Sequence, residues 1–197
     1  MPTQSLRRVR SRRMWFMAGL ASLLIATSFT PGSSPGANAI DLPLHLAKGG
    51  KVIPPKSGTW IGTYEEQKGS QLVKMNRVFA IEDLLGRNVD VDHNYTAWDE
   101  PFPAWREKWD IAHGRVPFVS WAKTSSSSVN SGRYDKLIRQ RAQDVKEFGH
   151  PLLLEWFWEM DGNRNKHIAG SPEKFIAAWE RIYRIFDKAG ADNASFV

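Results

Sequence analysis

The chain has 197 residues, with 27 lysines and arginines against 21 aspartates and glutamates, and it contains no cysteine. Without cysteine there is no disulfide framework, no thiolate nucleophile and no thiolate metal site. The basic excess lies in the first 39 residues, which hold five arginines and no acid, so the rest has 22 basic and 21 acidic side chains. The charge therefore predicts no nucleic-acid partner and no anionic membrane surface.

Residues 1–39 have the pattern of a secretory signal peptide. A basic segment precedes an apolar stretch from Met14 to Thr27, and Ala37-Asn38-Ala39 is a small-residue cleavage signal. The apolar stretch is short for a membrane span, so an uncleaved anchor is the less favoured alternative. Paired arginines leave a twin-arginine export route open. We expect a secreted protein that has no membrane partner after the leader is removed.

The predicted secondary structure then alternates between strands and helices. Residues 40–57 contain Gly-Gly and Pro-Pro pairs and predict an irregular lead-in. Strands are predicted at Gly58–Tyr64, Asn88–Tyr95 and Arg115–Ala122, from Pro151 toward Glu159, and at the start of Asn193–Val197. Helices are predicted at Gln71–Leu85, at Pro101–His113, between Tyr134 and Gly149, and between Ser171 and Gly190. The serine-rich segment Lys123–Gly132 predicts a loop.

This order predicts an α/β fold with a parallel sheet and crossover helices. Both a doubly wound sheet and a (β/α)8 TIM barrel would produce it. The first strand-to-helix turn has no glycine-rich phosphate-binding pattern, which disfavours the nucleotide-binding sheet. A barrel typically has about 250 residues, so we expect residues 58–197 to form the N-terminal portion of a barrel, truncated at about the fifth strand.

The chain is organised around residues 151–165, PLLLEWFWEMDGNRN. An apolar run typical of a buried strand ends in a turn-forming cluster that begins at Glu159. Binding and catalytic groups gather at this end of parallel strands. Apolar neighbours also disfavour the ionised form of a carboxylate, which suits a general acid. The alternative is a strand that merely ends on a solvated glutamate, and these residues alone leave both open.

A second catalytic carboxylate is not evident near Glu159. Regular strand alternation would place Glu155 and Glu159 on one face, with Trp158 on the other. Glu155 would then stand about 13 Å from Glu159 at roughly 3.3 Å per residue, which is too far for a glycosidase pair. Asp161 precedes a glycine and is better explained as a turn-forming residue.

Aromatic residues fall at the same predicted rim as Glu159. Tyr95, Trp98 and Trp121 lie near the C-terminal ends of the second and third strands. Such rings can stack on sugar faces, although each one singly is as well explained by core packing. The histidines have no metal-ligand spacing, so we predict no metal site and no cofactor.

Taken together, the sequence resembles glycoside hydrolase family 26, whose best-known members are endo-β-1,4-mannanases. The resemblance runs from about Gly58 to Val197. It is carried by Trp60-Ile61-Gly62, Leu85-Gly86-Arg87, Tyr95, Trp98, Val119-Ser120-Trp121, Ser131–Asp135 and, most specifically, Glu159-Met160-Asp161-Gly162.

The resemblance implies a TIM barrel, a retaining mechanism with Glu159 as acid/base, and a polysaccharide partner, mannan or a related β-glycan. It also implies substrate contacts for Tyr95, Trp98, Trp121 and Trp158. Glu155 stands where the family has arginine, and Trp158 where it often has histidine. The family nucleophile belongs near strand seven, so the resemblance implies that these residues alone are inactive.

Three functions follow in order of preference. The first is a secreted β-mannanase-type glycoside hydrolase. The alternative is a non-catalytic glycan-binding or remnant protein. An unrelated α/β hydrolase ranks last, because the sequence has no Ser-His-Asp signature.

Overall fold

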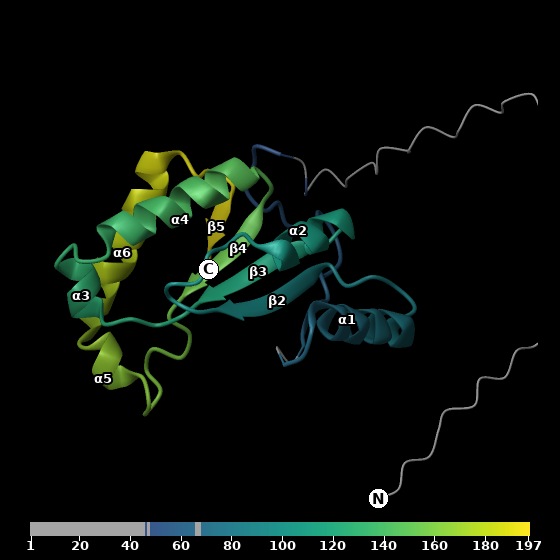
Figure 1. Cartoon of the computed structure of the whole chain (residues 1–197), viewed down its shortest axis with the longest axis horizontal. Helices are drawn as coiled ribbons and strands as arrows, with labels where there is room; N and C mark the ends of the chain where they lie inside the picture. The colour runs from purple at the N-terminus through teal and green to yellow at the C-terminus, as the bar shows by residue number, and fades with distance from the viewer. Residues whose placement is uncertain (1–45, 47, 66–67) are drawn as a thin grey trace, which may run out of the picture. The chain divides into compact units, whose positions relative to one another are not determined.

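The computed structural model describes residue 46 and residues 48–65 and 68–197, so the predicted signal peptide of residues 1–39 lies outside the described residues. In the described part, five strands form one parallel sheet (Figure 1). They are β1 (Gly62–Tyr64), β2 (Val91–Thr96), β3 (Val116–Trp121), β4 (Leu152–Trp156) and β5 (Ala194–Phe196). Each strand pairs with the next one along the chain.

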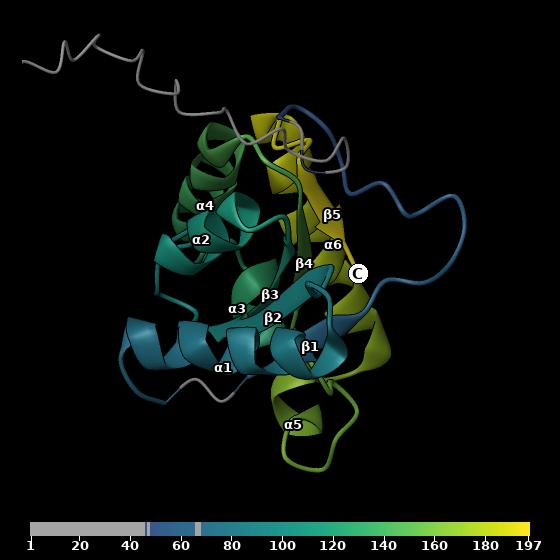
Figure 2. The same ribbon diagram turned by 90° about the vertical axis from the view of Figure 1, so that its right-hand side faces the viewer.

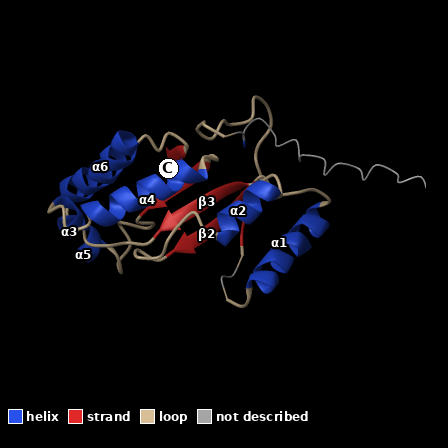
Figure 3. Cartoon of the chain, turned by 45° about the horizontal axis from the view of Figure 1, so that its top comes forward, coloured by secondary structure: helices blue, strands red, loops and turns tan. Residues whose placement is uncertain are grey.

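Helices separate the strands (Figure 3). They are α1 (Gln71–Leu85), α2 (Trp105–Ala112), α3 (Ser126–Asn130), α4 (Asp135–Phe148), α5 (Lys166–Ala169) and α6 (Pro172–Ala189). Figure 2 shows α1 beside β1 and β2, while α4 and α6 pack on each other. None of the described helices is long and apolar enough to cross a membrane.

The strand order decides between the two predicted architectures. A doubly wound sheet reverses its strand order at a switch point, whereas these strands follow chain order throughout. The prediction of a parallel α/β sheet of TIM-barrel type is therefore confirmed. Over the described residues the sheet is open, with β1 and β5 at its edges.

Local signals set the bounds of the long helices as predicted. The Ser70 hydroxyl accepts a hydrogen bond from the Val73 backbone at the start of α1, and Ser171 does the same for Lys174 at the start of α6. Both helices end at a glycine in the left-handed backbone region, which glycine adopts without steric cost. The N–H of this glycine donates to carbonyl groups of the last helical turn, which would otherwise lack a partner.

Several predicted bounds are wrong; β2, for example, begins at Val91 rather than Asn88. β1 covers three residues rather than Gly58–Tyr64, and α2 begins at Trp105 rather than Pro101. The segment Lys123–Gly132 is not wholly a loop, because it contains α3. The serines of α3 gain helical order from tertiary packing: Val129 is fully buried in the core against α6.

The two faces of the sheet differ in their surroundings. The outer face carries the main apolar core, in which Val119, Leu154 and Trp156 pack with residues of α4 and α6. The inner face is half-buried, with His93, Phe118 and Leu153 aligned across β2, β3 and β4. Parallel register places aligned residues on the same face, so the strand pairing determines which side chains can form a site.

The described part of the lead-in, residue 46 and residues 48–57, contains no strand, and some of its side chains are packed. Leu46 is fully buried in an apolar cluster with Val116. The half-buried side chains of Val52 and Leu153 pack against this cluster. The Val52 N–H donates to the Ser195 hydroxyl of β5 at 3.0 Å. The lead-in therefore covers the inner face near the N-terminal ends of the strands and leaves the C-terminal ends open for a site.

Candidate active site

The chain changes direction abruptly where β4 ends. The strand stops at Trp156, and both Phe157 (φ 66°) and Glu159 (φ 53°) adopt the left-handed backbone region. Non-glycine residues in that region cost roughly 1–3 kcal/mol each and concentrate at functional sites. The predicted strand alternation therefore fails beyond Trp156, and Phe157 turns into the outer core instead of the inner face.

The buried side chain of Asn165 holds this turn. Its Nδ2 atom donates to the carbonyl oxygens of Glu159 at 3.0 Å and of Trp158 at 3.4 Å. The Gly162 N–H also donates to the Glu159 carbonyl at 3.0 Å, and the Phe157 N–H donates to the Trp121 carbonyl of β3 at 3.2 Å. The Glu159 backbone is thus fixed to α5 on one side and to the sheet on the other.

The side chain of Glu159 is exposed to solvent. The expectation of an apolar enclosure for it is wrong, because the rings of Trp156 and Phe157 are buried in the outer core. Of the other two apolar neighbours in sequence, Trp158 is half-buried and Met160 is exposed, so neither encloses the carboxylate. Glu159 is therefore presented to a ligand rather than shielded from solvent.

Tyr95 and Trp158 come together at the C-terminal ends of β2 and β4. The centres of their rings lie 4.7 Å apart in an edge-to-face contact. The centre of the Tyr95 ring also lies 5.3 Å from that of Tyr64, with an interplanar angle of 83°. Tyr64 is 50% exposed and Tyr95 39%. We call Tyr64, Tyr95 and Trp158 the aromatic wall. Sequence reasoning missed Tyr64, although it ends a predicted strand.

Trp121 and Trp98 do not share that wall. Trp121 is fully buried, stacks on Trp98 at 4.1 Å, and donates its indole N–H to the Trp98 carbonyl at 3.0 Å. Trp121 lies in the outer core and half-buried Trp98 packs against that core, so the predicted grouping of these two rings with Tyr95 is wrong. The reason is the pleat: Tyr95 aligns with Ser120, whereas Trp121 aligns with Thr96 on the opposite face.

Three polar residues form a line across the inner face on adjacent strands. The Ser120 hydroxyl of β3 lies 2.7 Å from Nε2 of His93 on β2 and donates to Oε2 of Glu155 on β4. Burial lowers the pKa of His93, and the carboxylates of Glu155 and Asp92 offset this only partly. The Ser120 hydroxyl, which also contacts His93, therefore orients Glu155. The sequence offered no signal for this line.

Negative potential surrounds the Tyr95 hydroxyl. Burial raises the pKa of Tyr95, and the carboxylate of Glu155, the Tyr64 phenol and the carboxylate of Glu159 raise it further. Both carboxylates of this region therefore act on one ring of the aromatic wall. The site combines an exposed acid, a fixed inner acid and ring faces suited to a sugar.

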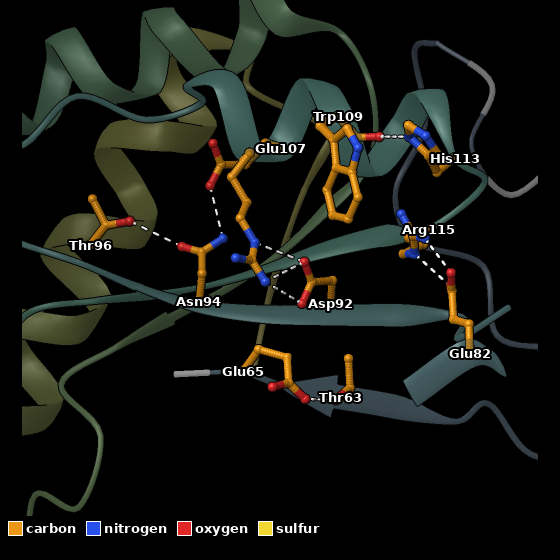
Figure 4. A network of polar contacts seen from close by, with 11 residues as sticks. Thr63, Glu65, Glu82, Asp92, Asn94, Thr96, Glu107, Trp109, His113 and Arg115 are labelled. Carbon is orange, nitrogen blue, oxygen red and sulfur yellow. Dashed lines mark hydrogen bonds and ion pairs between the residues drawn. The ribbon is translucent and has the colours of Figure 1, made fainter. Parts of the chain in front are cut away.

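On the other face of β2, a separate polar network fixes the strand (Figure 4). Arg106 of α2 makes two hydrogen bonds of 2.8 Å to Asp92, and Asn94 donates to Glu107 at 2.9 Å. Asp92 and Asn94 alternate with His93 and Tyr95 along β2, so the two pairs lie on opposite faces of the sheet. The outward network therefore sets the orientation of the two inward rings.

No metal-binding group of three or more histidine, aspartate or glutamate side chains occurs within residues 48–65 and 68–197 or at residue 46. The geometry is that of a surface site at the C-terminal ends of barrel-type strands, the place where TIM-barrel enzymes bind their substrates. Its acid, its aromatic wall and its open inner face define a candidate carbohydrate site.

Comparison with known proteins points to the same class. No family model matches the chain. Endoglucanase H of Acetivibrio thermocellus is 28% identical over 152 residues, which cover 72% of this chain and 16% of that protein. A β-mannanase from a symbiotic protist of the termite Reticulitermes speratus, solved with gluco-manno-oligosaccharide, has a similar fold, with a TM-score of 0.55 at 13% identity.

That structural match covers 70% of this chain and 55% of the mannanase chain. The chain therefore spans about half of the mannanase and a far smaller part of endoglucanase H. The two findings confirm the resemblance to glycosidases of family 26 type. They do not test the roles of individual residues, so those of Glu159, Tyr95, Trp98, Trp121 and Trp158 stay predictions.

Proposed function

We propose that the protein is a secreted glycoside hydrolase of β-mannanase type that cleaves β-1,4-linked polysaccharide with retention of configuration. The observation that carries this proposal is the exposed Glu159, held in a left-handed turn at the end of β4 beside the aromatic wall. The similarity to a β-mannanase fold and to endoglucanase H supports it. The leader pattern of residues 1–39 supports secretion.

In this proposal Glu159 is the acid/base. It would protonate the glycosidic oxygen as a second carboxylate attacks the anomeric carbon, which breaks the C–O bond and forms a glycosyl ester. Glu159 would then remove a proton from the water that hydrolyses this ester. Retaining enzymes hold the two carboxyl groups about 5–5.5 Å apart. The family resemblance assigns the nucleophile to strand seven, so the chemistry needs a carboxylate from outside the five described strands.

Substrate binding would fall to the aromatic wall. Tyr95 and Trp158 present ring faces next to the acid, and the phenol and indole N–H groups are available to sugar hydroxyls. Mannan or a related β-glycan is the proposed substrate, in keeping with the oligosaccharide bound to the mannanase.

A non-catalytic glycan-binding protein is the second candidate. It is favoured by Glu155 in the position of the family arginine and by Trp158 in place of histidine. Such a protein would retain the aromatic wall, while Glu159 would serve only as a hydrogen-bond acceptor.

Release of reducing ends from mannan, β-glucan and xylan tests the proposal, measured on the 197-residue chain and on a longer protein in which three further strand-helix units supply the nucleophile. We expect no release by the 197 residues alone, and hydrolysis by the longer protein that Glu159→Gln abolishes. The matched control is Asp161→Asn, which changes another exposed carboxylate of the same turn. Binding of mannan oligosaccharide without reducing-end release, unchanged by Glu159→Gln, would favour the glycan-binding alternative instead.

A further inference from the structure

The inner carboxylate of Glu155 has an unusual environment for a half-buried acid. It forms no ion pair with any described residue, and its one hydrogen bond in this part of the chain comes from Ser120. The ion pairs in the described part all involve other acids, such as Asp92 with Arg106 and Glu82 with Arg115. A partly desolvated carboxylate without a cation favours binding of one.

The orientation of Glu155 leaves one oxygen available. Ser120, itself in contact with His93, holds Oε2. Oε1 accepts no hydrogen bond from the described residues, and the inner face on which it lies is open at this end of the strands. The protein therefore fixes the carboxylate in advance, which lowers the entropic cost of binding a ligand.

The aromatic wall provides further attraction for a cation. The faces of aromatic rings carry negative potential and attract ammonium groups within about 6 Å. Tyr64 and Tyr95 stand nearly perpendicular, with large exposed fractions. The ammonium group of Lys123 already lies 5.2 Å from the centre of the Trp158 ring. Trp158 therefore already has a cation–π contact within the chain, and a ligand amine would meet the other two rings of the wall, Tyr64 and Tyr95.

We propose that Glu155, Tyr64 and Tyr95 form a subsite for the protonated amine of an amino sugar. The ligand would be a β-1,4-linked chain that contains glucosamine-type residues. This inference rests on the proposed function, because a glycan bound beside Glu159 would pass over the aromatic wall. The negative potential that the two carboxylates create at the Tyr95 hydroxyl acts in the same direction.

Calorimetric titration of the full chain with three tetrasaccharides tests the subsite. The probes are the β-1,4 tetramers of glucosamine, N-acetylglucosamine and mannose, of which only the first is cationic. We expect the glucosamine tetramer to bind at least about fivefold more tightly than either neutral tetramer, as one partly exposed charge contact predicts. Added salt should reduce this preference.

Substitutions locate the preference. Glu155→Gln keeps the shape and the acceptor for Ser120, so it should lower the ratio of the affinity for the glucosamine tetramer to that for the neutral tetramers to about one. Glu180→Gln is the matched control, because Glu180 is an exposed acid on the outer helix α6. Tyr64→Leu, at an exposed edge position, removes a ring and should weaken the preference even if Glu155→Gln fails to fold.

The outcomes separate this inference from the proposed function. Neutral and cationic tetramers binding equally would overturn the subsite and leave the glycosidase proposal standing. A preference that persists in both Glu155→Gln and Tyr64→Leu would also overturn it. Failure of all three tetramers to bind would overturn both proposals. A preference that disappears in Glu155→Gln would support the subsite, and it would do so whether or not the longer protein hydrolyses any polysaccharide.

Discussion

The side-chain amide of Asn165 lies 3.0 Å from the carbonyl oxygen of Glu159, so a buried residue of the next turn fixes the backbone of the proposed acid/base. Glu159 adopts a φ of 53° that a glutamate rarely takes. Positioning of the acid therefore depends on a contact that only the folded chain creates.

Asn165→Ala should loosen this turn. We expect a loss of about 1–3 kcal/mol in the free energy of unfolding, because two carbonyl groups lose their donor. Any hydrolytic activity should fall through kcat more than through KM, since Glu159 is displaced while the aromatic wall is not. Urea unfolding and steady-state kinetics measure the two effects. Asn163→Ala, at an exposed position of the same loop, is the control. Equal behaviour of the two variants would refute the assigned role.

Glu159→Gly should separate stability from function. Glycine takes a positive φ without steric cost, so the free energy of unfolding should rise by up to about 1 kcal/mol. Glu159→Gln retains the strained backbone and should give no such gain. Both variants should lack hydrolytic activity. Parallel urea titrations decide the matter, and a glycine variant less stable than the glutamine variant would argue against strain at this position.

Trp121 and Trp158 should respond differently to truncation. Trp121→Ala removes a fully buried ring from the core and should destabilise the fold by about 3–5 kcal/mol. Trp158→Ala, at a half-buried position of the aromatic wall, should leave most stability in place and weaken oligosaccharide binding. Thermal melting and calorimetry give the comparison. Unchanged oligosaccharide binding in Trp158→Ala would remove this ring from the proposed site.

Asp110 should make stability depend on pH. Burial, and then the nearby carboxylate of Asp92, raise the pKa of Asp110 well above its usual value. The folded protein thus holds a proton that the unfolded chain releases at a pH of about 3.9. The raised pKa of Asp110 therefore makes the free energy of unfolding fall as the pH rises from the pKa of the unfolded chain toward that of the folded protein.

Asp110→Asn removes this titration while keeping the shape of the side chain. The variant should have a larger free energy of unfolding than the parent chain at neutral pH. This difference should vanish at about pH 3, below the pKa of the unfolded aspartate. Urea unfolding between these limits measures it. Asp83→Asn, at an exposed position of α1, is the control and should show a flat difference. A constant difference for Asp110→Asn as well would contradict the raised pKa.

The sequence by itself determined features that depend on neighbouring residues. Serine caps and terminal glycines set the bounds of α1 and α6, and the alternation of strands and helices predicted the parallel α/β fold that the sheet confirms. Apolar residues followed by a turn-forming cluster also placed Glu159 in a turn that follows the fourth strand, although the strand ends earlier, at Trp156. These signals are short-range, so they can be recognised before the chain is folded.

Tertiary structure alone decided which side chains share the site. Ser120 follows His93 by 27 residues and precedes Glu155 by 35 residues. The three side chains meet only through the register of their strands. The same register turned Trp121 into the core, because a shift of one residue moves a side chain to the other face. The register is set by packing of the whole sheet against its helices, which no local pattern encodes.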